Sequence, residues 1–370
     1  MKHNISNHKI KVCFISGGLS DGGIGRALSN LVNALCVSEH IEVYIFSYRK
    51  SAKEDIYKLP SRVKREYLTD NYMSMKKFLL RGGTSDLRNL LKRHNINVAV
   101  ACGVLFFPLV TVASILANVR SICWEHTSPE TATDLKGQHL FRYIGAYLST
   151  ANVVISKGAL EYYRKKYKNK NNILIYNGLD SMLKSKLNSY NPNTKKIISV
   201  GRLTDAKDYH RLIRIAKIVL NAHQDWKWDI YGEGELRKSL EAAITENGLE
   251  DRVVLKGHID NIYDVYQNYS IFVMTSKYEG FPMVLLEAAY MGLPLIAFDI
   301  KTGPSEIIDN KNGFLCNKDQ DTDMIDAIIK TIKSSELRLQ QSKNSRIAVM
   351  KYDISRIADQ WIEVINSITM

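Results

Sequence analysis

Residues 276–299, SKYEGFPMVLLEAAYMGLPLIAFD, decide the fold of the second half of this chain. Their pattern predicts a loop, a helix and then a buried strand. Pro282 suits the first helical position, because its fixed φ fits there and no hydrogen-bond donor is needed, and Gly292 ends the helix. This order places Glu279 in the loop beside the helix N-terminus and Glu287 about one and a half turns inside the helix.

The N-terminus of that helix predicts an anion site. Its backbone N–H groups, from about Met283 to Leu285, lack partners within the helix, and the helix dipole adds partial positive charge there. Two carboxylates beside such a site suit a ligand that is part phosphate and part polyol, such as a nucleotide sugar. The alternative is that Glu279 is an ordinary loop charge and Glu287 a solvated charge on the helix surface.

The spacing of the two glutamates is also a family signature. EGFPMVLLE, followed by GLPLIAFD and TGPSEII, resembles the C-terminal signature of the retaining glycosyltransferases of family 4, and VGRLTDAKDYHRLI upstream resembles the same pattern. The resemblance covers most of residues 10–350. Its motifs are specific in the C-terminal half and loose in the N-terminal half. It implies an α/β fold of GT-B architecture, with two facing Rossmann-like, doubly wound domains and an active site in the interdomain cleft.

The resemblance assigns roles to several side chains. It implies that Arg202 and Lys207 grip the nucleotide diphosphate, for which a guanidinium fork and an ammonium are also chemically suited. Glu279 would bind sugar hydroxyls, Glu287 the nucleotide ribose, and His126, at the end of the strand predicted within RSICWEHTSPE, would lie beside the donor sugar. The expected catalytic residues are Glu279, His126, Arg202 and Lys207. The expected donor-binding residues are Gly22, Gly23, Arg202, Lys207, Gly232, Gly234, Glu279, Gly280, Phe281, Met283, Val284, Leu285 and Glu287.

Strands that alternate with helices in both halves predict two parallel sheets. The first half opens with the apolar run IKVCFI, the glycine-rich turn SGGLSDGG and an amphipathic helix, and the second half starts afresh at KIISVGR. We expect an N-terminal acceptor-side domain over residues 1–180, a linker over 181–195, a nucleotide-sugar-binding domain over 196–350 and a C-terminal helix over 351–370 that crosses back to the first domain.

Two other nucleotide-binding classes fit less well. The dinucleotide fingerprint G-x-G-x-x-G fails, since Leu28 stands at its third glycine and Ser47 ends the next strand where an acidic residue would hold a ribose. A nicotinamide oxidoreductase is therefore disfavoured, and no G-x-x-x-x-G-K-[ST] phosphate loop occurs. The D-x-D within residues 319–323 precedes a helical run and indicates helix-capping acids, so we expect no metal and no cofactor.

The positive charge of the chain lies in its first half. Residues 1–180 contain 26 lysines and arginines against 13 acidic residues, whereas residues 181–370 contain 25 of each, so the first half holds the whole net charge of +13. The clusters YRKSAKEDIYKLPSRVKREY and EYYRKKYKNKNN are interleaved with tyrosines. Such a face suits an anionic membrane surface, a lipid-diphosphate acceptor or nucleic acid, or is simply solvated.

The cysteines and the apolar segments of the sequence also predict where the protein is located in the cell. The five cysteines form no C-x-x-C pair and indicate buried thiols in a reducing compartment. No signal peptide is recognised, and Gly103 and Pro108 divide the apolar stretch 98–117 into a strand and a helix rather than a membrane span. We therefore expect a cytoplasmic protein that is peripheral on the inner face of the plasma membrane.

These observations favour a retaining, metal-independent glycosyltransferase. It would move a hexose or N-acetylhexosamine from a nucleoside-diphosphate sugar to a glycan or lipid-linked acceptor in the synthesis of surface polysaccharides such as capsule or O-antigen. UDP is expected from its frequency in the family. The alternative is a basic membrane- or nucleic-acid-binding protein with a non-catalytic nucleotide-sugar site. Nucleic acid is not the expected partner, because no recognised nucleic-acid module occurs.

Overall fold

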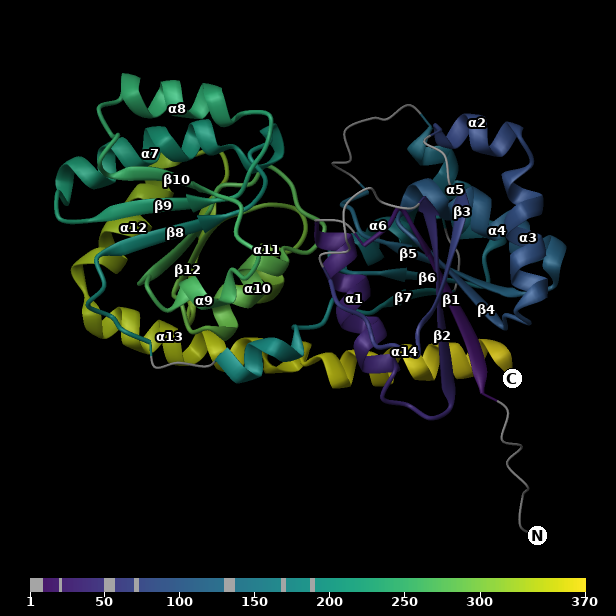
Figure 1. The fold of residues 1–370 in the computed structure, drawn as a ribbon. Helices are drawn as coiled ribbons and strands as arrows, with labels where there is room; N and C mark the ends of the chain where they lie inside the picture. Colours follow the sequence, from purple (N-terminus) through teal and green to yellow (C-terminus); the bar gives the residue numbers. More distant parts are fainter. Residues whose placement is uncertain are drawn as a thin grey trace, which may run out of the picture. The chain divides into compact units, whose positions relative to one another are not determined.

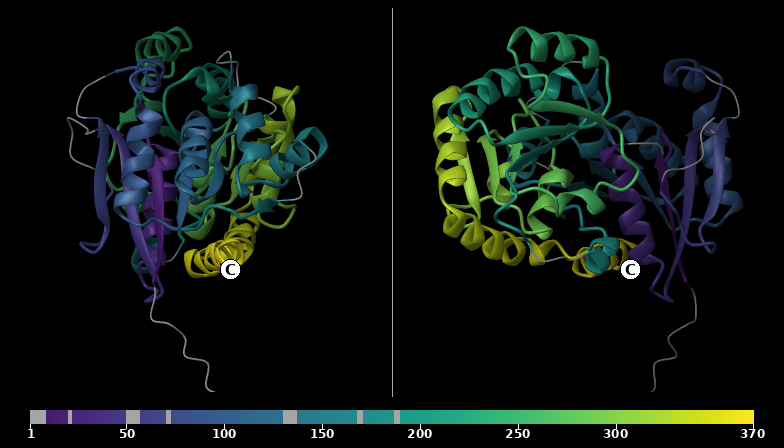
Figure 2. Two further views of the ribbon diagram at one scale, coloured as in Figure 1. Left: turned by 90° about the vertical axis from the view of Figure 1, so that its right-hand side faces the viewer. Right: turned by 60° about the vertical axis from the view of Figure 1, so that its left-hand side comes forward.

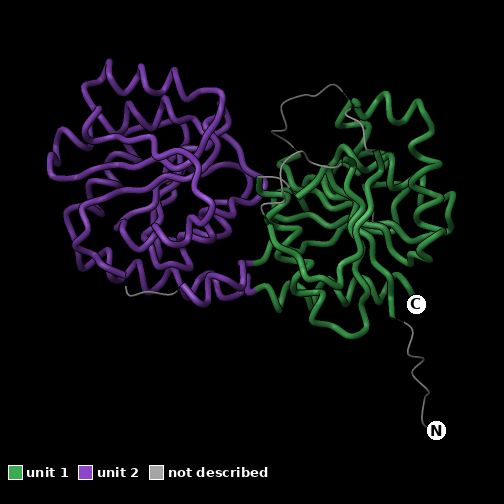
Figure 3. Tube along the Cα trace, in the orientation of Figure 1, with its two compact units in different colours: residues 1–178, 354–370 green, residues 179–353 purple. Residues whose placement is uncertain are grey.

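The computed structural model describes residues 9–19, 22–49, 57–69, 73–129, 137–167, 171–186 and 190–370. The chain divides into two compact units (Figure 3). Unit 1 comprises residues 1–178 and 354–370, and unit 2 comprises residues 179–353. The chain therefore passes between the units twice, after Gly178 and after Asp353.

Within the described residues, unit 1 contains a seven-stranded parallel sheet in the order β3-β2-β1-β4-β5-β6-β7 (Figure 1). The central strands are apolar and fully buried because helices cover both faces, as in doubly wound folds. The strands are β1 (Ile10–Ser16), β2 (Ile41–Arg49), β3 (Lys64–Thr69), β4 (Val98–Cys102), β5 (Arg120–Glu125), β6 (Ala151–Val154) and β7 (Asn172–Leu174).

The helices of unit 1 lie on two sides of this sheet. Cys13 of β1 belongs to the core beneath α3 and α4, whereas the next residue, Phe14, contacts Trp361 of α14. Since successive strand residues point to opposite faces, α14 lies on the face opposite α3 and α4. It runs beside α1, as Figures 1 and 2 show. The helices are α1 (Gly23–Leu35), α2 (Met75–Leu80), α3 (Gly83–Arg93), η1 (Val104–Phe106), α4 (Phe107–Ala117), α5 (Gln138–Leu148), α6 (Lys157–Tyr167) and α14 (Ile354–Thr369).

Unit 2 contains a six-stranded parallel sheet in the order β10-β9-β8-β11-β12-β13 among the described residues. Its strands are β8 (Lys196–Val200), β9 (Lys227–Tyr231), β10 (Val253–Gly257), β11 (Ile271–Met274), β12 (Leu295–Asp299) and β13 (Gly313–Asn317). Its helices are η2 (Ser181–Lys186), η3 (Asp205–Lys207), α7 (Tyr209–Ala222), α8 (Arg237–Glu246), α9 (Tyr263–Tyr266), α10 (Met283–Tyr290), α11 (Pro304–Ile307), α12 (Asp321–Lys333), α13 (Ser335–Val349) and η4 (Met350–Tyr352).

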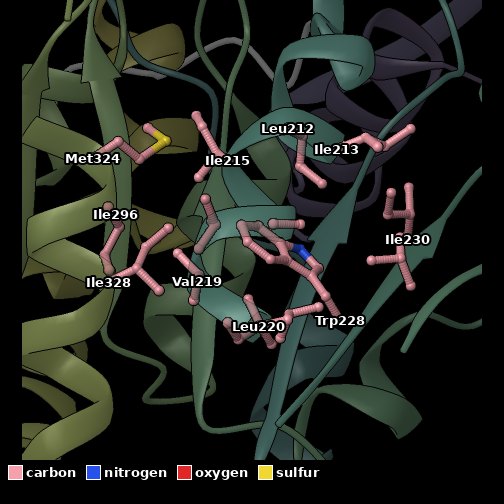
Figure 4. Packing of buried hydrophobic residues seen from close by; sticks show 14 of the residues in the cluster. Leu212, Ile213, Ile215, Val219, Leu220, Trp228, Ile230, Ile296, Met324 and Ile328 are labelled. Carbon is pink, nitrogen blue, oxygen red and sulfur yellow. The ribbon is translucent and has the colours of Figure 1, made fainter. Parts of the chain in front are cut away.

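The core of unit 2 forms where α7 and α12 cover the sheet (Figure 4). Apolar residues of α7 recur at helical spacing, as in Leu212, Ile215 and Val219, and pack beside Trp228 of β9 and Ile328 of α12. All five are fully buried, and burial of each such side chain contributes about 1.5–3 kcal/mol. The two sheets confirm the predicted α/β class with two Rossmann-like domains.

One boundary differs from the sequence expectation, and the expected division of the apolar stretch 98–117 is confirmed. Residues 181–195, expected as a linker, lie inside unit 2, where 181–186 form η2 and the Tyr190 hydroxyl donates a 2.7 Å hydrogen bond to the Ser270 carbonyl. Polar, Asn/Pro-rich composition marks surface turns as well as linkers, so composition could not separate the two. The stretch 98–117 forms β4, η1 and α4, and no helix in the described parts of the chain could cross a membrane.

Candidate functional site

Two turns at the carboxyl ends of β8 and β9 pack directly on one another. The Leu203 N–H donates to the Glu233 carbonyl at 2.9 Å, and the Gly201 N–H donates to the Tyr231 carbonyl at 2.9 Å. A Cβ on Gly232 would clash with the Gly201 carbonyl, and one on Gly234 would clash with Leu203. Packing alone therefore requires these two glycines, and their predicted contact with a nucleotide stays a prediction.

The predicted basic pair follows β8. Arg202 is exposed, and its side chain has no hydrogen-bond or ion-pair partner among the residues that the structure describes. Lys207 reaches back across this turn, since its Cε would lie 3.1 Å from a Cβ on Gly201. Lys207 thus lies against the turn that carries Arg202, at the carboxyl edge of the sheet.

Lys207 also joins this turn to the loop after β11. Its Nζ forms an ion pair with the Glu279 carboxylate, which in addition accepts a 2.7 Å hydrogen bond from the Ser276 hydroxyl. The side chains of Lys207 and Glu279 are only 20% and 13% exposed. The Thr275 hydroxyl donates to the Lys207 carbonyl at 2.9 Å, which fixes the backbone of the same residue. The structure therefore brings two predicted site residues, 72 positions apart in sequence, into direct contact.

Helix α10 begins one residue later than the sequence predicts. Pro282 has ψ 95°, an extended conformation, and it precedes the first helical residue, Met283. The Leu285 N–H already donates to the Pro282 carbonyl at 3.1 Å, so the expected free donors narrow to Met283 and Val284. Neither of these two N–H groups has a backbone partner in the described chain. The predicted anion site keeps two donors rather than three.

The side chains around this helix start are mostly inaccessible. Phe281 is 6% exposed and packs against the Tyr352 ring with centroids 5.3 Å apart, and Leu285 is fully buried. Only backbone atoms of these residues could contact a ligand. Glu287 is also 0% exposed, so it is not a solvated helix charge, and that alternative is wrong.

A contact that sequence reasoning missed supports the Glu279 loop. The Thr302 hydroxyl donates to the Glu279 carbonyl, and Gly303, at φ 100°, lies against Pro282 so closely that its Cβ would be 2.5 Å from the proline Cδ. Both residues belong to the motif TGPSEII. The motif was recognisable, but its role as a support for residues 279–282 depends on the neighbouring positions of β11 and β12.

The remaining predicted residues lie in unit 1. Gly22, at φ 135°, precedes α1, and its carbonyl accepts from Arg26 N–H at 3.1 Å, while Gly23 is the exposed first residue of the helix. No side chain caps this helix start, and a Cβ on either glycine would meet open space. An accessible helix N-terminus is therefore present, and its use for a donor stays a prediction.

His126 follows β5 and is 9% exposed. Its imidazole lies against Trp124, with ring centroids 4.1 Å apart, and its Nε2 has no hydrogen-bond partner among the described residues. Burial disfavours the charged form and lowers the pKa of His126 to about 3, so the ring is neutral near pH 7. A neutral imidazole can donate or accept a hydrogen bond to a hydroxyl without bringing charge.

No cluster of metal-ligating side chains occurs in the described parts of the chain. The D-x-D acids lie in the first turn of α12, where Asp321 pairs with Arg211 at 2.5 Å and Asp323 accepts a 3.3 Å hydrogen bond from Asn317 N–H. Both acids thus have the structural partners expected of residues at a helix start.

Comparison with known proteins shows that the part of the chain with this site is similar to one family. Residues 182–348 match the model described as "Glycosyl transferases group 1". The amylovoran biosynthesis glycosyltransferase AmsD of Erwinia amylovora is 26% identical over 363 residues, covering 96% of this chain and 99% of its own length. A Campylobacter jejuni enzyme named as a GalNAc-α-(1→4)-GalNAc-α-(1→3)-diNAcBac-PP-undecaprenol α-1,4-N-acetyl-D-galactosaminyltransferase is 26% identical over 371 residues, covering 96% and 98%.

A solved structure shows the same fold over the whole length. Anabaena Alr3699/HepE, crystallised in complex with UDP and glucose, superposes with a TM-score of 0.83 at 18% sequence identity, covering 97% of this chain and 100% of its own. The matched segment lies within unit 2 and includes Arg202, Lys207, Glu279 and Glu287. The chain has the GT-B fold, and its residues 182–348 match the model of the glycosyl transferases group 1 family.

Proposed function

We propose that this protein is a retaining, metal-independent glycosyltransferase that uses a UDP-sugar in the synthesis of a surface polysaccharide. The observation that supports it best is the set of ligand-type groups at one edge of unit 2. The exposed Arg202, the Lys207–Glu279 ion pair and the free amides of Met283 and Val284 follow β8 and β11, which are neighbours in the sheet. Parallel sheets of this kind bind ligands at the carboxyl ends of their strands.

The chemistry of glycosyl transfer matches these groups. The transition state resembles an oxocarbenium ion, so the protein must stabilise a departing diphosphate while holding the sugar against an acceptor hydroxyl. Arg202, Lys207 and the two α10 amides supply positive charge and donors for the diphosphate. Glu279 is assigned to sugar hydroxyls and Glu287 to the ribose, while His126, as a neutral imidazole, is assigned to the sugar.

Retention of configuration needs no enzyme nucleophile in this proposal. The leaving phosphate accepts the proton of the acceptor hydroxyl as the new glycosidic bond forms on the same face of the sugar. No divalent cation is required, because Arg202, Lys207 and the helix N-terminus already supply positive potential. The nucleotide is taken as UDP because HepE binds it, and the sugar as a hexose or N-acetylhexosamine.

The acceptor is proposed to be a glycan or lipid-linked oligosaccharide at the cytoplasmic leaflet. The names of the Erwinia and Campylobacter relatives point to polysaccharide and undecaprenol-linked substrates. Unit 1 adds a structural argument, since the neighbouring helices η1, α4 and α5 expose apolar side chains to water. These are Leu105, Val112, Ile115, Leu116, Leu140, Tyr143, Tyr147 and Leu148, each between 38% and 59% exposed.

Three basic residues lie on a helix that contacts this apolar surface, and a fourth is exposed elsewhere in unit 1. Arg164, Lys165 and Lys166 are exposed in the last turn of α6, the helix next to α5. Arg49 is exposed at the end of β2, whereas Lys50 and Lys53 of the same predicted cluster lie outside the described residues. An apolar helix face beside several cations suits an anionic lipid surface, to which each cation contributes about 1 kcal/mol.

The donor proposal is tested by a thermal-shift panel of UDP, GDP, ADP, NAD and short oligonucleotides, because a ligand that binds only the folded state raises the melting temperature. UDP should give the largest shift. UDP-sugars that shift it further are then incubated with acceptor, and NMR of the product anomeric proton reports the configuration. An inverted product, or loss of nearly all turnover in EDTA, would refute retention or metal independence respectively. Stabilisation by oligonucleotides alone would favour the nucleic-acid-binding alternative.

Membrane association is tested by sedimentation with vesicles. The protein should sediment with anionic vesicles at low salt and be released at about 0.5 M NaCl, where the Debye length is well below its value of about 10 Å at 0.1 M. Charge reversal of Arg164, Lys165 and Lys166 should weaken the binding. Leu140→Asp should weaken it in a salt-independent way. A wild-type protein that ignores anionic vesicles would favour a soluble acceptor.

A further inference from the structure

The segment Trp124–Thr127, at the end of β5, is held from both faces of the sheet. Its side chains alternate, so Trp124 and His126 point to one face while Glu125 points to the other. Trp124 and Glu125 are almost completely buried, and His126 is 9% exposed. Since Nε2 of His126 has no hydrogen bond to a described residue, the orientation of its ring depends on what holds its neighbours.

On the first face, the last helix of the chain supports His126. Trp361 of α14 is fully buried and meets Trp124 edge to face, with ring centroids 4.9 Å apart and planes at 70°. Trp124 in turn contacts the His126 ring at 4.1 Å. Phe14 of β1 closes the cluster, with centroids 6.2 Å from Trp361 and 6.4 Å from Trp124. Edge-to-face rings at these separations fix relative orientation as well as burying area.

On the opposite face, a buried charge network fixes the backbone on both sides of His126. Glu125 accepts hydrogen bonds from Arg142 Nε at 2.6 Å, the Tyr163 hydroxyl at 2.9 Å and the Thr127 N–H at 3.1 Å. The Thr127 hydroxyl also donates to Glu125 at 2.6 Å and accepts from Arg142 Nη2 at 2.8 Å. Arg142 of α5 is 0% exposed. The residues before and after His126 are thereby tied to one guanidinium.

This buried network contributes little net stability to the fold. A buried ion pair often contributes no more to stability than well-packed apolar residues of the same size, because both charges lose their hydration. Its particular property is directional, since the hydrogen bonds to Glu125 and Thr127 allow a single backbone arrangement. Preorganised groups at reacting centres commonly depend on such supporting residues.

We propose that Trp361 and Arg142 are positioning residues that fix the His126 imidazole from opposite faces of the sheet. Trp361 acts through Trp124, and Arg142 acts through Glu125 and Thr127. The consequence for sugar transfer rests on the role proposed for His126 above, whereas the orientation of the ring does not. This assigns a function in unit 1 to α14, the helix that follows unit 2 in sequence.

The test compares two mild variants with one control in the full-length protein. Trp361→Phe removes the edge of the indole while keeping an aromatic ring, and Thr127→Val removes one hydroxyl from the network at nearly constant volume. Ile365→Ala is the control. Ile365 is as buried as Trp361 and lies on the same helix, but it is not part of the aromatic cluster around Trp124. A melting curve for each variant shows that it is folded and gives its loss of stability.

The readout is the His126 ring itself, followed by NMR and assigned by comparison with His126→Gln. In the wild type the ring should stay neutral into acid, whereas in Trp361→Phe and Thr127→Val its resonances should move and its titration shift towards the ordinary histidine range. Turnover should fall by roughly tenfold or more, the scale on which a misplacement of about 1 Å acts. KM for the donor and Kd for UDP should change by less than about twofold, because the donor-binding groups of unit 2 are untouched.

Ile365→Ala should lose stability without either effect. The proposal is overturned if Trp361→Phe and Thr127→Val leave the His126 resonances and turnover as in Ile365→Ala. If the resonances move but His126→Gln is as active as the wild type, the two-sided support stands and the catalytic role of His126 falls. If Trp361→Phe fails to fold, Thr127→Val still decides the Arg142 side of the proposal, because loss of one hydroxyl leaves the apolar core intact. Trp361→Tyr, which keeps an aromatic ring, then takes the place of Trp361→Phe on the other face.

Discussion

Replacing Lys207 by alanine tests whether the Lys207–Glu279 pair belongs to a diphosphate site. In the wild type the two side chains form an ion pair, 20% and 13% exposed. Removing the ammonium deletes one attraction for the diphosphate. It also leaves the Glu279 carboxylate without its cation, so that the same carboxylate now repels a bound phosphate. Nucleotide affinity should therefore be lowered by two effects, the lost attraction and the new repulsion.

The geometry sets the size of the effect. Two unit charges about 4 Å apart interact by about 4 kcal/mol at an effective dielectric constant near 20. Desolvation and the remaining contact with water offset much of this, so a net contribution of about 2 kcal/mol is expected. UDP affinity, measured by calorimetric titration, should fall about thirtyfold in Lys207→Ala. The double variant with Glu279→Gln removes the repulsion and should recover about 1 kcal/mol, or about fivefold.

A neighbouring lysine provides the control. Lys277 lies in the same loop region and pairs with Asp205 at 2.6 Å, but it is 42% exposed and is not assigned to the donor. Lys277→Ala removes the same charge and should change UDP affinity by less than about twofold, as expected for an exposed ion pair. The reasoning is refuted if folded Lys207→Ala binds UDP as Lys277→Ala does. It is also refuted if the double variant binds no better than the single one.

Five further substitutions have definite expected outcomes. Arg202→Ala should weaken UDP by about 2 kcal/mol, the loss of a charge-assisted contact, and calorimetry with unchanged affinity would contradict it. Glu279→Gln should slow transfer and spare UDP binding, whereas Glu287→Gln should weaken UDP as well; equal losses of affinity would mean that the assigned roles are wrong. Gly303→Ala should destabilise unit 2 by about 2 kcal/mol in urea unfolding, since φ is 100° and the new Cβ would meet a proline ring. Burial keeps His126 unprotonated in the folded protein and lowers its pKa to about 3, so its contribution to stability is present above about pH 6.5 and is lost as the pH falls. His126→Gln should reduce this loss of stability in acid. An equally steep fall of the free energy of unfolding with pH in His126→Gln would contradict the prediction.

The sequence predicted the type of each element near the site better than its contacts. Glu279 lies in a loop and Glu287 in a helix, as the positions of Pro282 and Gly292 indicate. The pattern could not show that Glu287 is fully buried, because a glutamate at an ordinary helical spacing looks the same on a solvated face. The first helical residue was missed by one position, since proline fits both the first turn and the residue before it.

Contacts between distant segments depended on strand order, which alternation of strands and helices does not determine. The Lys207–Glu279 pair exists because β11 lies beside β8 in the sheet. In the chain, six elements separate these two strands, namely η3, α7, β9, α8, β10 and α9. The support from Thr302 and Gly303 exists because β12 lies beside β11. The family pattern marked these residues together, and the sheet order supplies the physical reason for their proximity.

The same logic separates the two halves of the proposed machinery. Arg202, Lys207 and Glu279 are held by turns of unit 2, whereas His126 is held by β5, α5 and α14 of unit 1. Each group therefore has its supporting contacts within its own unit. Substitutions in the turns that hold Arg202, Lys207 and Glu279 should lower nucleotide affinity more than turnover. Substitutions in the residues that hold His126 should lower turnover more than nucleotide affinity. A full set of variants in which affinity and turnover fall together, whichever unit is changed, would show that this division of roles is wrong.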